Sequence, residues 1–215
     1  MGQIVRKKIG IMGGTFDPIH VGHLILGEKA YEQLQLDKVL FMPSGNPPHK
    51  RHREGRATDA ERTEMVRNAI RCNPHFELSL IEMHKDGYSY TYRTLEMLKK
   101  EHPDTDYYFI IGADSLLNFS TWKEPKRICQ AATMVVAGRD HVSERLLNEK
   151  MAELSEKFHG TFLSLNTMNI DVSSEMIRSW IREGRSIRYY VPDDVIQYIY
   201  KNKVYLGENT ADGKI

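Results

Sequence analysis

The sequence predicts an α/β fold, a Rossmann-like doubly wound parallel sheet with additional helices at its C-terminal end. Short apolar segments alternate with helix-like segments along almost the whole chain, and this alternation is typical of right-handed βαβ units. Glycines follow several of the apolar segments, at the positions where ligand-binding turns occur in parallel sheets. The 215 residues fit one domain. We assign residues 1–206 to this domain and expect the polar residues 207–215 to form a flexible tail.

The first predicted unit pairs a strand over residues 9–12 with a helix over residues 22–36, where apolar residues recur at helical spacing. A second strand is predicted over residues 39–42 and ends at Pro43. Residues 43–57 contain three prolines and a group of basic side chains, which indicates a mobile loop.

The capping-box pair Thr58 and Glu61 begins a predicted helix over residues 58–71. A strand over residues 76–81 and a helix over residues 92–100 follow.

Two strongly apolar strands are predicted over residues 107–111 and 133–137, and each is followed by a glycine. A helix over residues 143–157 and a short strand over residues 161–165 continue the alternation. Two helices complete the prediction, over residues 174–183 and 192–202.

Charge and composition exclude several functional classes. Lys plus Arg total 30 and Asp plus Glu total 29, a formal charge of +1, so bulk attraction to nucleic acid or to an anionic membrane is not expected. No apolar run approaches the roughly 18–20 residues of a transmembrane helix or the length of a signal-peptide core. Cys72 and Cys129 are too few for a disulfide framework, and we expect reduced, half-buried thiols in a cytoplasmic protein.

The densest chemical signal is the segment Gly13-Gly14-Thr15-Phe16-Asp17-Pro18-Ile19-His20-Val21-Gly22-His23, between the first strand and the first helix. Its paired glycines allow a ligand to approach the backbone closely. The N-terminus of the following helix favours an anion. His20 and His23 are three residues apart, so both face one side of the helix start and can donate hydrogen bonds to phosphate.

Other phosphate motifs do not fit this segment. A Walker motif requires Gly-Lys-Ser/Thr, and the only Gly-Lys pair is Gly213-Lys214. The dinucleotide fingerprint requires a G-x-G-x-x-G spacing, which Gly10, Gly13 and Gly14 do not provide. Zinc binding lacks an obvious third ligand. The structural alternative to phosphate binding is that both histidines lie in the core, with their hydrogen bonds made within the protein.

The tetrapeptide His20-Val21-Gly22-His23 matches the (H/T)xGH signature, and with the preceding residues it resembles bacterial nicotinate-nucleotide adenylyltransferases of the HxGH nucleotidyltransferase superfamily. The resemblance covers roughly residues 8–205. Further motifs match in order: Pro47-Pro48-His49-Lys50, Ser89-Tyr90-Thr91, Ile111-Gly112-Ala113-Asp114-Ser115, Trp122-Lys123, and Asp171-Val172-Ser173-Ser174 leading to Ile177-Arg178. Glu175 departs from the family, whose members commonly carry Thr there.

The resemblance implies transfer of AMP from ATP to nicotinic acid mononucleotide, giving nicotinic acid adenine dinucleotide and pyrophosphate in NAD biosynthesis. It implies Mg²⁺ carried by the ATP phosphates rather than by a protein metal site. ATP and the mononucleotide are therefore the expected partners, without nucleic acid or membrane. Members of the family often form homodimers.

The resemblance also assigns roles to individual residues. The catalytic assignments are His20, His23 and Arg178. The ATP-binding assignments are Gly13, Gly14, Thr15, Phe16, His20, Gly22, His23, Gly112, Asp114, Ser173, Ser174 and Arg178. The mononucleotide-binding assignments are His49, Lys50, Thr91, Trp122 and Arg139.

Some of these residues have a plain structural interpretation as well. Ser173 and Asp114 are both suited to cap a helix N-terminus, and Trp122 can cover the edge of the core.

Three other functions stay open from the sequence. A pantetheine-phosphate adenylyltransferase is similar at the histidine motif, but such chains are typically shorter and usually have Thr at the position of His20. A nucleic-acid-binding module would use the basic residues 47–53. A metal-dependent hydrolase would use His20, His23 and His49.

Overall fold

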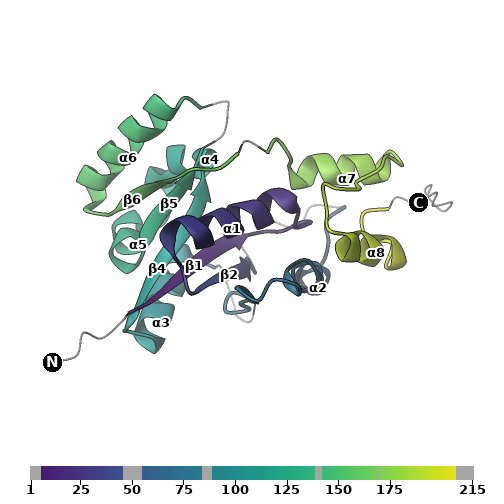
Figure 1. Ribbon diagram of the computed structural model, residues 1–215, viewed down its shortest axis with the longest axis horizontal. Coiled ribbons are helices and arrows are strands. Elements are labelled where there is room, and N and C mark those ends of the chain that lie inside the picture. Colours follow the sequence, from purple (N-terminus) through teal and green to yellow (C-terminus); the bar gives the residue numbers. More distant parts are fainter. Residues whose placement is uncertain (1–5, 46–54, 84–88, 139–141, 169, 207–215) are drawn as a thin grey trace.

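The computed structural model describes residues 6–45, 55–83, 89–138, 142–168 and 170–206. The predicted site residues His49, Lys50 and Arg139 lie outside the described residues, as does the predicted tail over residues 207–215. The described chain forms one six-stranded parallel sheet with helices on both faces (Figure 1), so the predicted α/β fold is confirmed.

The strands are β1 (Lys7–Gly14), β2 (Lys38–Pro43), β3 (Phe76–Leu78), β4 (Thr105–Gly112), β5 (Thr133–Ala137) and β6 (Phe162–Leu165). The α-helices are α1 (Val21–Leu34), α2 (Asp59–Ile70), α3 (Thr91–Glu101), α4 (Ala113–Leu117), α5 (Pro125–Ala131), α6 (Glu144–Phe158), α7 (Ser174–Arg182) and α8 (Asp193–Lys201). A 3₁₀-helix, η1, covers Phe119–Thr121.

The strand order is β3-β2-β1-β4-β5-β6. From β1 the chain builds outward to β2 and β3, then returns to place β4 on the other side of β1 and continues to β5 and β6. In the register, Ile11 of β1 lies opposite Leu40 of β2 and Phe109 of β4. The reversal between β1 and β4 creates a crevice at the carboxyl ends of these strands, which is where open α/β sheets bind ligands.

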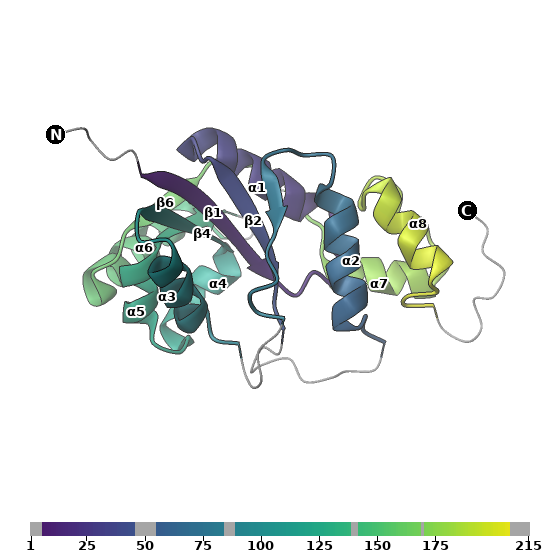
Figure 2. The same cartoon turned by 90° about the horizontal axis from the view of Figure 1, so that it is seen from below.

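Two hydrophobic clusters cover the two faces of the sheet. Successive residues of a strand point to opposite faces, so Met12 and Ile110 belong to one cluster and Ile11 and Phe109 to the other. The first cluster includes side chains of α1, α2, α7 and α8, and the second includes side chains of α3 to α6. Figure 2 shows α1 and the group α3, α4 and α5 on opposite sides of the strands.

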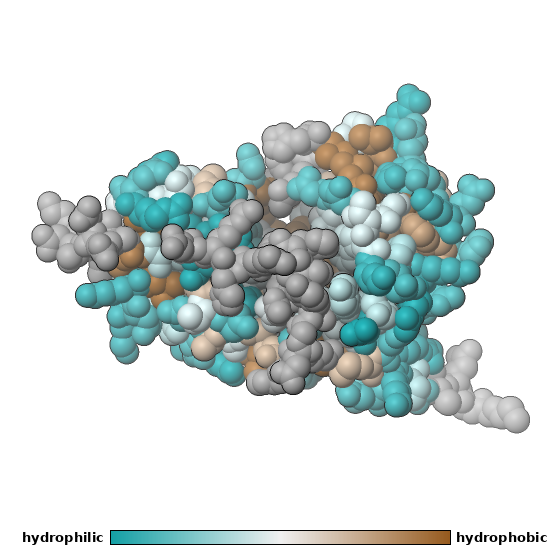
Figure 3. All heavy atoms as spheres, turned by 180° about the vertical axis from the view of Figure 1, so that it is seen from behind, coloured by the Kyte–Doolittle hydropathy of each residue, from teal (hydrophilic) through white to brown (hydrophobic). Residues whose placement is uncertain are grey.

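The C-terminal helices α7 and α8 lie beyond the sheet, beside α2, in both ribbon views (Figures 1 and 2). After α8 the chain returns toward the first loop, where Tyr205 is buried. Hydrophilic residues cover most of the described surface in Figure 3, and hydrophobic residues form separate patches there. No helix among the described residues is long and apolar enough to cross a membrane.

Three sequence expectations about local structure need correction. The strand predicted over residues 76–81 ends at Leu78, because the following residues form a turn in which the Met83 N–H donates to the Leu80 carbonyl. Helix α5 was not predicted, although Pro125 in its first turn is a typical helix-start signal. The cysteines are not both half-buried, because Cys72 is exposed and Cys129 is buried.

Candidate active site

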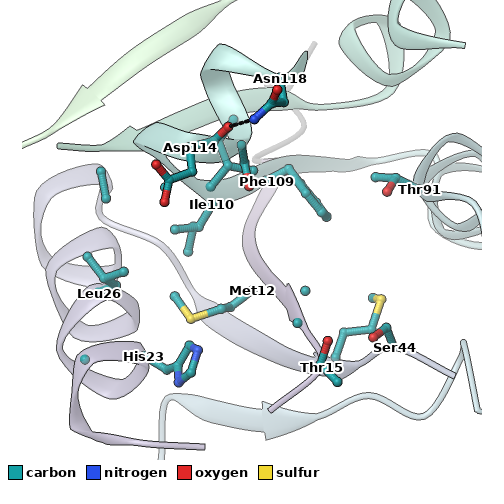
Figure 4. A pocket seen from close by; sticks show the side chains of 18 of the residues that line it. Met12, Thr15, His23, Leu26, Ser44, Thr91, Phe109, Ile110, Asp114 and Asn118 are labelled. Atoms are coloured by element: carbon teal, nitrogen blue, oxygen red, sulfur yellow. Dashed lines mark hydrogen bonds between the residues drawn. The ribbon is translucent and has the colours of Figure 1, made fainter. Parts of the chain in front are cut away.

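A cavity of about 730 Å³ lies at the carboxyl ends of the central strands (Figure 4). Its wall includes residues at or just after the ends of four strands, namely Gly14, Ser44, Gly112 and Gly138. Its volume is in the range of small-molecule binding sites. The predicted site residues on its wall are Gly13, Gly14, Thr15, His20, Gly22, His23, Thr91, Gly112, Asp114 and Trp122.

The two histidines of the motif lie together on this wall at the start of α1. Their ring centroids are 3.8 Å apart. The backbone N–H of His20 donates to Nδ1 of His23 at 3.2 Å, and the N–H of His23 donates to the carbonyl of His20 at 3.0 Å. Because Nδ1 of His23 accepts a hydrogen bond, a neutral His23 ring carries its proton on Nε2.

Gly22 is the position in the motif where a side chain would disturb this pair. A Cβ atom at Gly22 would lie 3.1 Å from the imidazole of His20 and 3.1 Å from Cγ1 of Val172. Such a contact is closer than ordinary van der Waals packing, so a side chain here would displace His20 or the segment that carries Val172. The glycine of the motif therefore lets α1 begin directly against the cavity wall.

Phe16 lies beneath the cavity wall and supports His23. Its side chain is buried, and its ring meets the ring of His23 edge-on at a centroid distance of 5.0 Å. The backbone of Phe16 has φ of 50°, the left-handed region that residues other than glycine rarely adopt. The segment over residues 13–23, which we call the histidine loop, thus turns sharply at Phe16.

Thr91 and Trp122 also line the cavity. Thr91 is the first residue of α3, and Figure 4 shows it across the cavity from His23. The ring of Trp122 is half-buried and lies 5.4 Å from the ring of Phe119, with the ring of Phe109 edge-on at 6.2 Å. Trp122 therefore covers the edge of the core and also forms part of the cavity wall, so its two interpretations are compatible.

Asp114 lies on the wall in the first turn of α4, but it is not the residue that caps this helix. The N-cap position belongs to Gly112. The capping role considered from the sequence is therefore wrong, because α4 begins at Ala113, two residues before the start at Ser115 that an Asp114 cap implies. The backbone carbonyl of Asp114 accepts a hydrogen bond from the side-chain amide of Asn118 at 2.9 Å (Figure 4).

Phe16, Ser173, Ser174 and Arg178 are not part of the cavity wall. Ser173 caps α7 by accepting a hydrogen bond from the N–H of Met176 at 3.2 Å. The Ser174 hydroxyl donates to the carbonyl of Pro18 at 2.8 Å. The guanidinium of Arg178 donates to the Asp17 carbonyl, and its Nη1 lies 3.6 Å from Oδ2 of Asp17. The N-terminus of α7 thus packs against the histidine loop at residues 17–18.

Sequence reasoning missed the buried carboxylate of Asp17, which is 2% exposed. Its Oδ1 accepts hydrogen bonds from the Tyr205 hydroxyl at 2.7 Å and from the Ala57 N–H at 3.1 Å. Burial, and then the charge of Asp17, raise the pKa of the Tyr205 phenol. No local pattern links residues so far apart in the chain, so a single sequence carries no signal for this contact.

The described wall carries two carboxylates, Glu82 and Asp114, and one ammonium group, Lys123. No group of three or more His, Cys, Asp or Glu side chains suited to a metal ion occurs within the described ranges. His49, the third histidine of the hydrolase alternative, falls outside them. An anion bound beside His20 and His23 would therefore meet these two imidazoles on the wall.

Comparison with known proteins gives the following matches. The model of the cytidylyltransferase-like family matches residues 11–180. The chain is 44% identical over 200 residues to a probable nicotinate-nucleotide adenylyltransferase of Lachnoclostridium phytofermentans, covering 93% of this chain and 100% of that one. It is 42% identical over 199 residues to a protein of the same name from Clostridium tetani, covering 93% and 99%.

A solved structure shares the fold. It is the Plasmodium falciparum nicotinic acid mononucleotide adenylyltransferase complexed with NaAD, with a TM-score of 0.76 and 21% sequence identity. The match covers 93% of this chain and 97% of that chain.

Proposed function

We propose adenylyl transfer as the reaction of this chain, which belongs to the nicotinate-nucleotide adenylyltransferases of the cytidylyltransferase-like family. The phosphate of nicotinic acid mononucleotide attacks the α-phosphorus of ATP. A phosphorus–oxygen bond forms between the two nucleotides, and the bond from the α-phosphorus to the oxygen that bridges to the β-phosphate breaks. The products are nicotinic acid adenine dinucleotide and pyrophosphate.

The observation that carries this proposal is the pair of imidazoles, His20 and His23, on the cavity wall at the N-terminus of α1. The attacking phosphate is already an anion, so the reaction needs no general base. The protein must instead overcome the repulsion between two negatively charged nucleotides. Hydrogen-bond donors held in fixed positions offset that repulsion. His20, His23 and the backbone N–H groups over residues 13–16 are the donors that we assign to the α-phosphate.

We assign the nicotinate ring to the opposite wall. The first N–H groups of a helix have no acceptor within that helix, so Thr91 offers a hydroxyl and a helix N-terminus to the nicotinate carboxylate. The indole of Trp122 provides a flat apolar surface for the pyridine ring. His49, Lys50 and Arg139 remain proposed contacts of the mononucleotide.

Ser173, Ser174 and Arg178 remain proposed phosphate contacts. In support, Ser174 and Arg178 contact the histidine loop at Pro18 and Asp17, next to the proposed α-phosphate position. We further propose that Mg²⁺ enters with ATP as a complex with the triphosphate, and that the Asp114 carboxylate on the wall would help to hold it. When bound, Mg²⁺ neutralises charge on the departing pyrophosphate. Since ATP is made and used in the cytoplasm, we propose that compartment.

A pyrophosphate-release assay with ATP and Mg²⁺ tests the proposal. The acceptors are nicotinic acid mononucleotide, nicotinamide mononucleotide and phosphopantetheine, each supplied alone. We expect preference for nicotinic acid mononucleotide. In nicotinamide mononucleotide an amide replaces the carboxylate, so some hydrogen-bond donors of the site lose their acceptor. Equal rates with both mononucleotides would contradict the assignments of Thr91 and Trp122, and preference for phosphopantetheine would favour a pantetheine-phosphate adenylyltransferase.

A further inference from the structure

Arg62 is a buried charged residue that the proposed reaction leaves without a role. It lies on α2, is 4% exposed and does not form part of the cavity wall. Its Nη1 donates to the carbonyl of Thr15 at 2.6 Å, and its Nη2 donates to the carbonyl of Ser44 at 2.8 Å. Nη2 also donates to the carboxylate of Asp59 at 2.6 Å. A single guanidinium therefore holds two carbonyl groups whose residues both line the cavity.

These two carbonyls come from different strand ends. Thr15 follows β1 in the histidine loop, and Ser44 follows β2. Figure 4 shows the two side chains close together on one side of the cavity. Because a peptide group is planar and trans, its C=O and the N–H of the next residue point in opposite directions. Holding the Thr15 carbonyl toward Arg62 therefore directs the N–H of Phe16 away from Arg62.

The residues that follow these two carbonyls have an unusual or a crowded backbone. Phe16 has a φ of 50°, so the peptide that Arg62 holds precedes a left-handed residue. Gly45 follows Ser44, and a Cβ atom at Gly45 would lie 2.2 Å from the carbonyl oxygen of Glu82, another residue of the wall. The Ser44–Gly45 peptide is thus confined between Arg62 and the backbone at Glu82.

We propose that Arg62 is a positioning residue for ATP, which acts by keeping the carbonyls of Thr15 and Ser44 turned away from the bound phosphates. A carbonyl oxygen carries a partial negative charge, so either peptide, if it turned over, would present that charge to an anion and withdraw an N–H donor. The planar fork of arginine reaches both carbonyls at once, which the single ammonium group of lysine does not reproduce. The inference rests on the proposed function for the identity of the anion.

The test compares Arg62→Lys and Arg62→Ala with Arg67→Ala, a control on the same helix. Arg67 is exposed and pairs with Glu64 at 3.2 Å, so its loss removes a cation from α2 without touching the wall. We expect Arg62→Lys to raise the KM for ATP about 10-fold, with the KM for the mononucleotide within about 2-fold of wild type. Loss of folded protein alone would lower the apparent kcat and leave both KM values unchanged, and that result would overturn the proposal.

Chemical rescue tests the role of the cation itself. In Arg62→Ala we expect kcat/KM for ATP to fall about 100-fold, and about 20 mM guanidinium to restore it about 10-fold. Urea has a similar shape without the charge, so equal rescue by urea would contradict the role of a charged fork. If Arg62→Ala does not fold, the KM values of Arg62→Lys still decide the question.

Calorimetric titration of ATP into the same variants, without an acceptor, separates this inference from the proposed function. Weaker ATP binding in Arg62→Lys supports the positioning role even if the wild-type protein releases no pyrophosphate, in which case the proposed function alone fails. If the wild-type protein releases pyrophosphate and Arg62→Lys binds ATP as tightly as wild type, the inference is contradicted and the proposed function is not affected.

Discussion

At the scale of single residues, one backbone hydrogen bond decides which nitrogen of His23 can meet a substrate. Nδ1 accepts from the N–H of His20, which leaves the proton of a neutral ring on Nε2. The edge of the Phe16 ring packs against the same imidazole. His23 can therefore donate to a phosphate oxygen from Nε2 without first gaining a proton.

Replacing His23 with alanine tests this donor. We expect His23→Ala to lower kcat by about 100-fold or more, as for other lost donors to a transition state. The control is His102→Ala, since His102 is exposed at the C-terminal end of α3 and has no place in the cavity. Steady-state rates with both substrates varied give kcat and KM separately. An unchanged kcat with only weaker ATP binding would mean that His23 binds the ground state and the transition state equally.

The two cysteines differ in environment and should differ in reactivity. Burial raises the pKa of the Cys129 thiol from 9.0 to about 11, whereas Cys72 is exposed. Since the thiolate is the reactive form, a thiol reagent at pH 8 should label one cysteine per native chain and two per unfolded chain. Rapid labelling of both in the native protein, identified by peptide mass, would contradict the buried position of Cys129.

The same pKa shift predicts a pH dependence of stability. Below pH 9 the Cys129 thiol is protonated in both the folded and the unfolded chain, so it adds no pH dependence. Between pH 9 and about 11 the unfolded chain releases the proton while the folded chain keeps it. The free energy of unfolding contributed by this group therefore falls as the pH rises through that range.

At the scale of secondary-structure elements, the histidine loop is held by elements from both halves of the chain. Its carbonyls accept from α2 and α7, and its Asp17 carboxylate accepts from the segment after α8. The first N–H of α1, on Val21, donates to the carbonyl of Tyr190, just before α8. The helices that lie beyond the sheet thus stabilise the loop that carries the proposed chemistry.

Tyr205→Phe measures one of these contacts. The change removes the hydroxyl that donates to the buried Asp17 carboxylate, and a hydrogen bond to a charged group contributes about 1.5–3 kcal/mol. We expect the free energy of unfolding in urea to fall by about that amount. Tyr189→Phe is the matched control, because Tyr189 is 84% exposed, and it should change stability by less than about 0.5 kcal/mol. Equal effects of the two substitutions would refute the contribution of this contact.

The long helices and strands were predicted from the sequence more accurately than the short ones. The long periodic helices and the apolar strands were predicted close to their observed bounds, because hydrophobic spacing reports directly on burial. Helix α4 has five residues and starts directly from the end of β4, so no periodic pattern fixes its first residue. Strand β3 has only three residues, and pairing with β2 rather than its own sequence sets its end.

At the scale of the whole molecule, the parallel sheet and the family were predicted from the sequence and are confirmed. The strand order explains why the histidine loop and Gly112 share a cavity although they are far apart in the chain. The positions of Arg62, Asp17 and Tyr205 behind the loop were not predicted. Their contacts join distant segments through polar side chains, and such contacts produce no periodic hydrophobic pattern in the sequence.

The most direct test of the central claim is a crystal structure of the protein with the dinucleotide product bound. The account predicts the bridging phosphates in the cavity between β1 and β4, with a ring nitrogen of His20 and of His23 within hydrogen-bond distance, about 3 Å, of phosphate oxygens. A dinucleotide bound elsewhere on the protein, or phosphates separated from both imidazoles by more than about 6 Å, would contradict it.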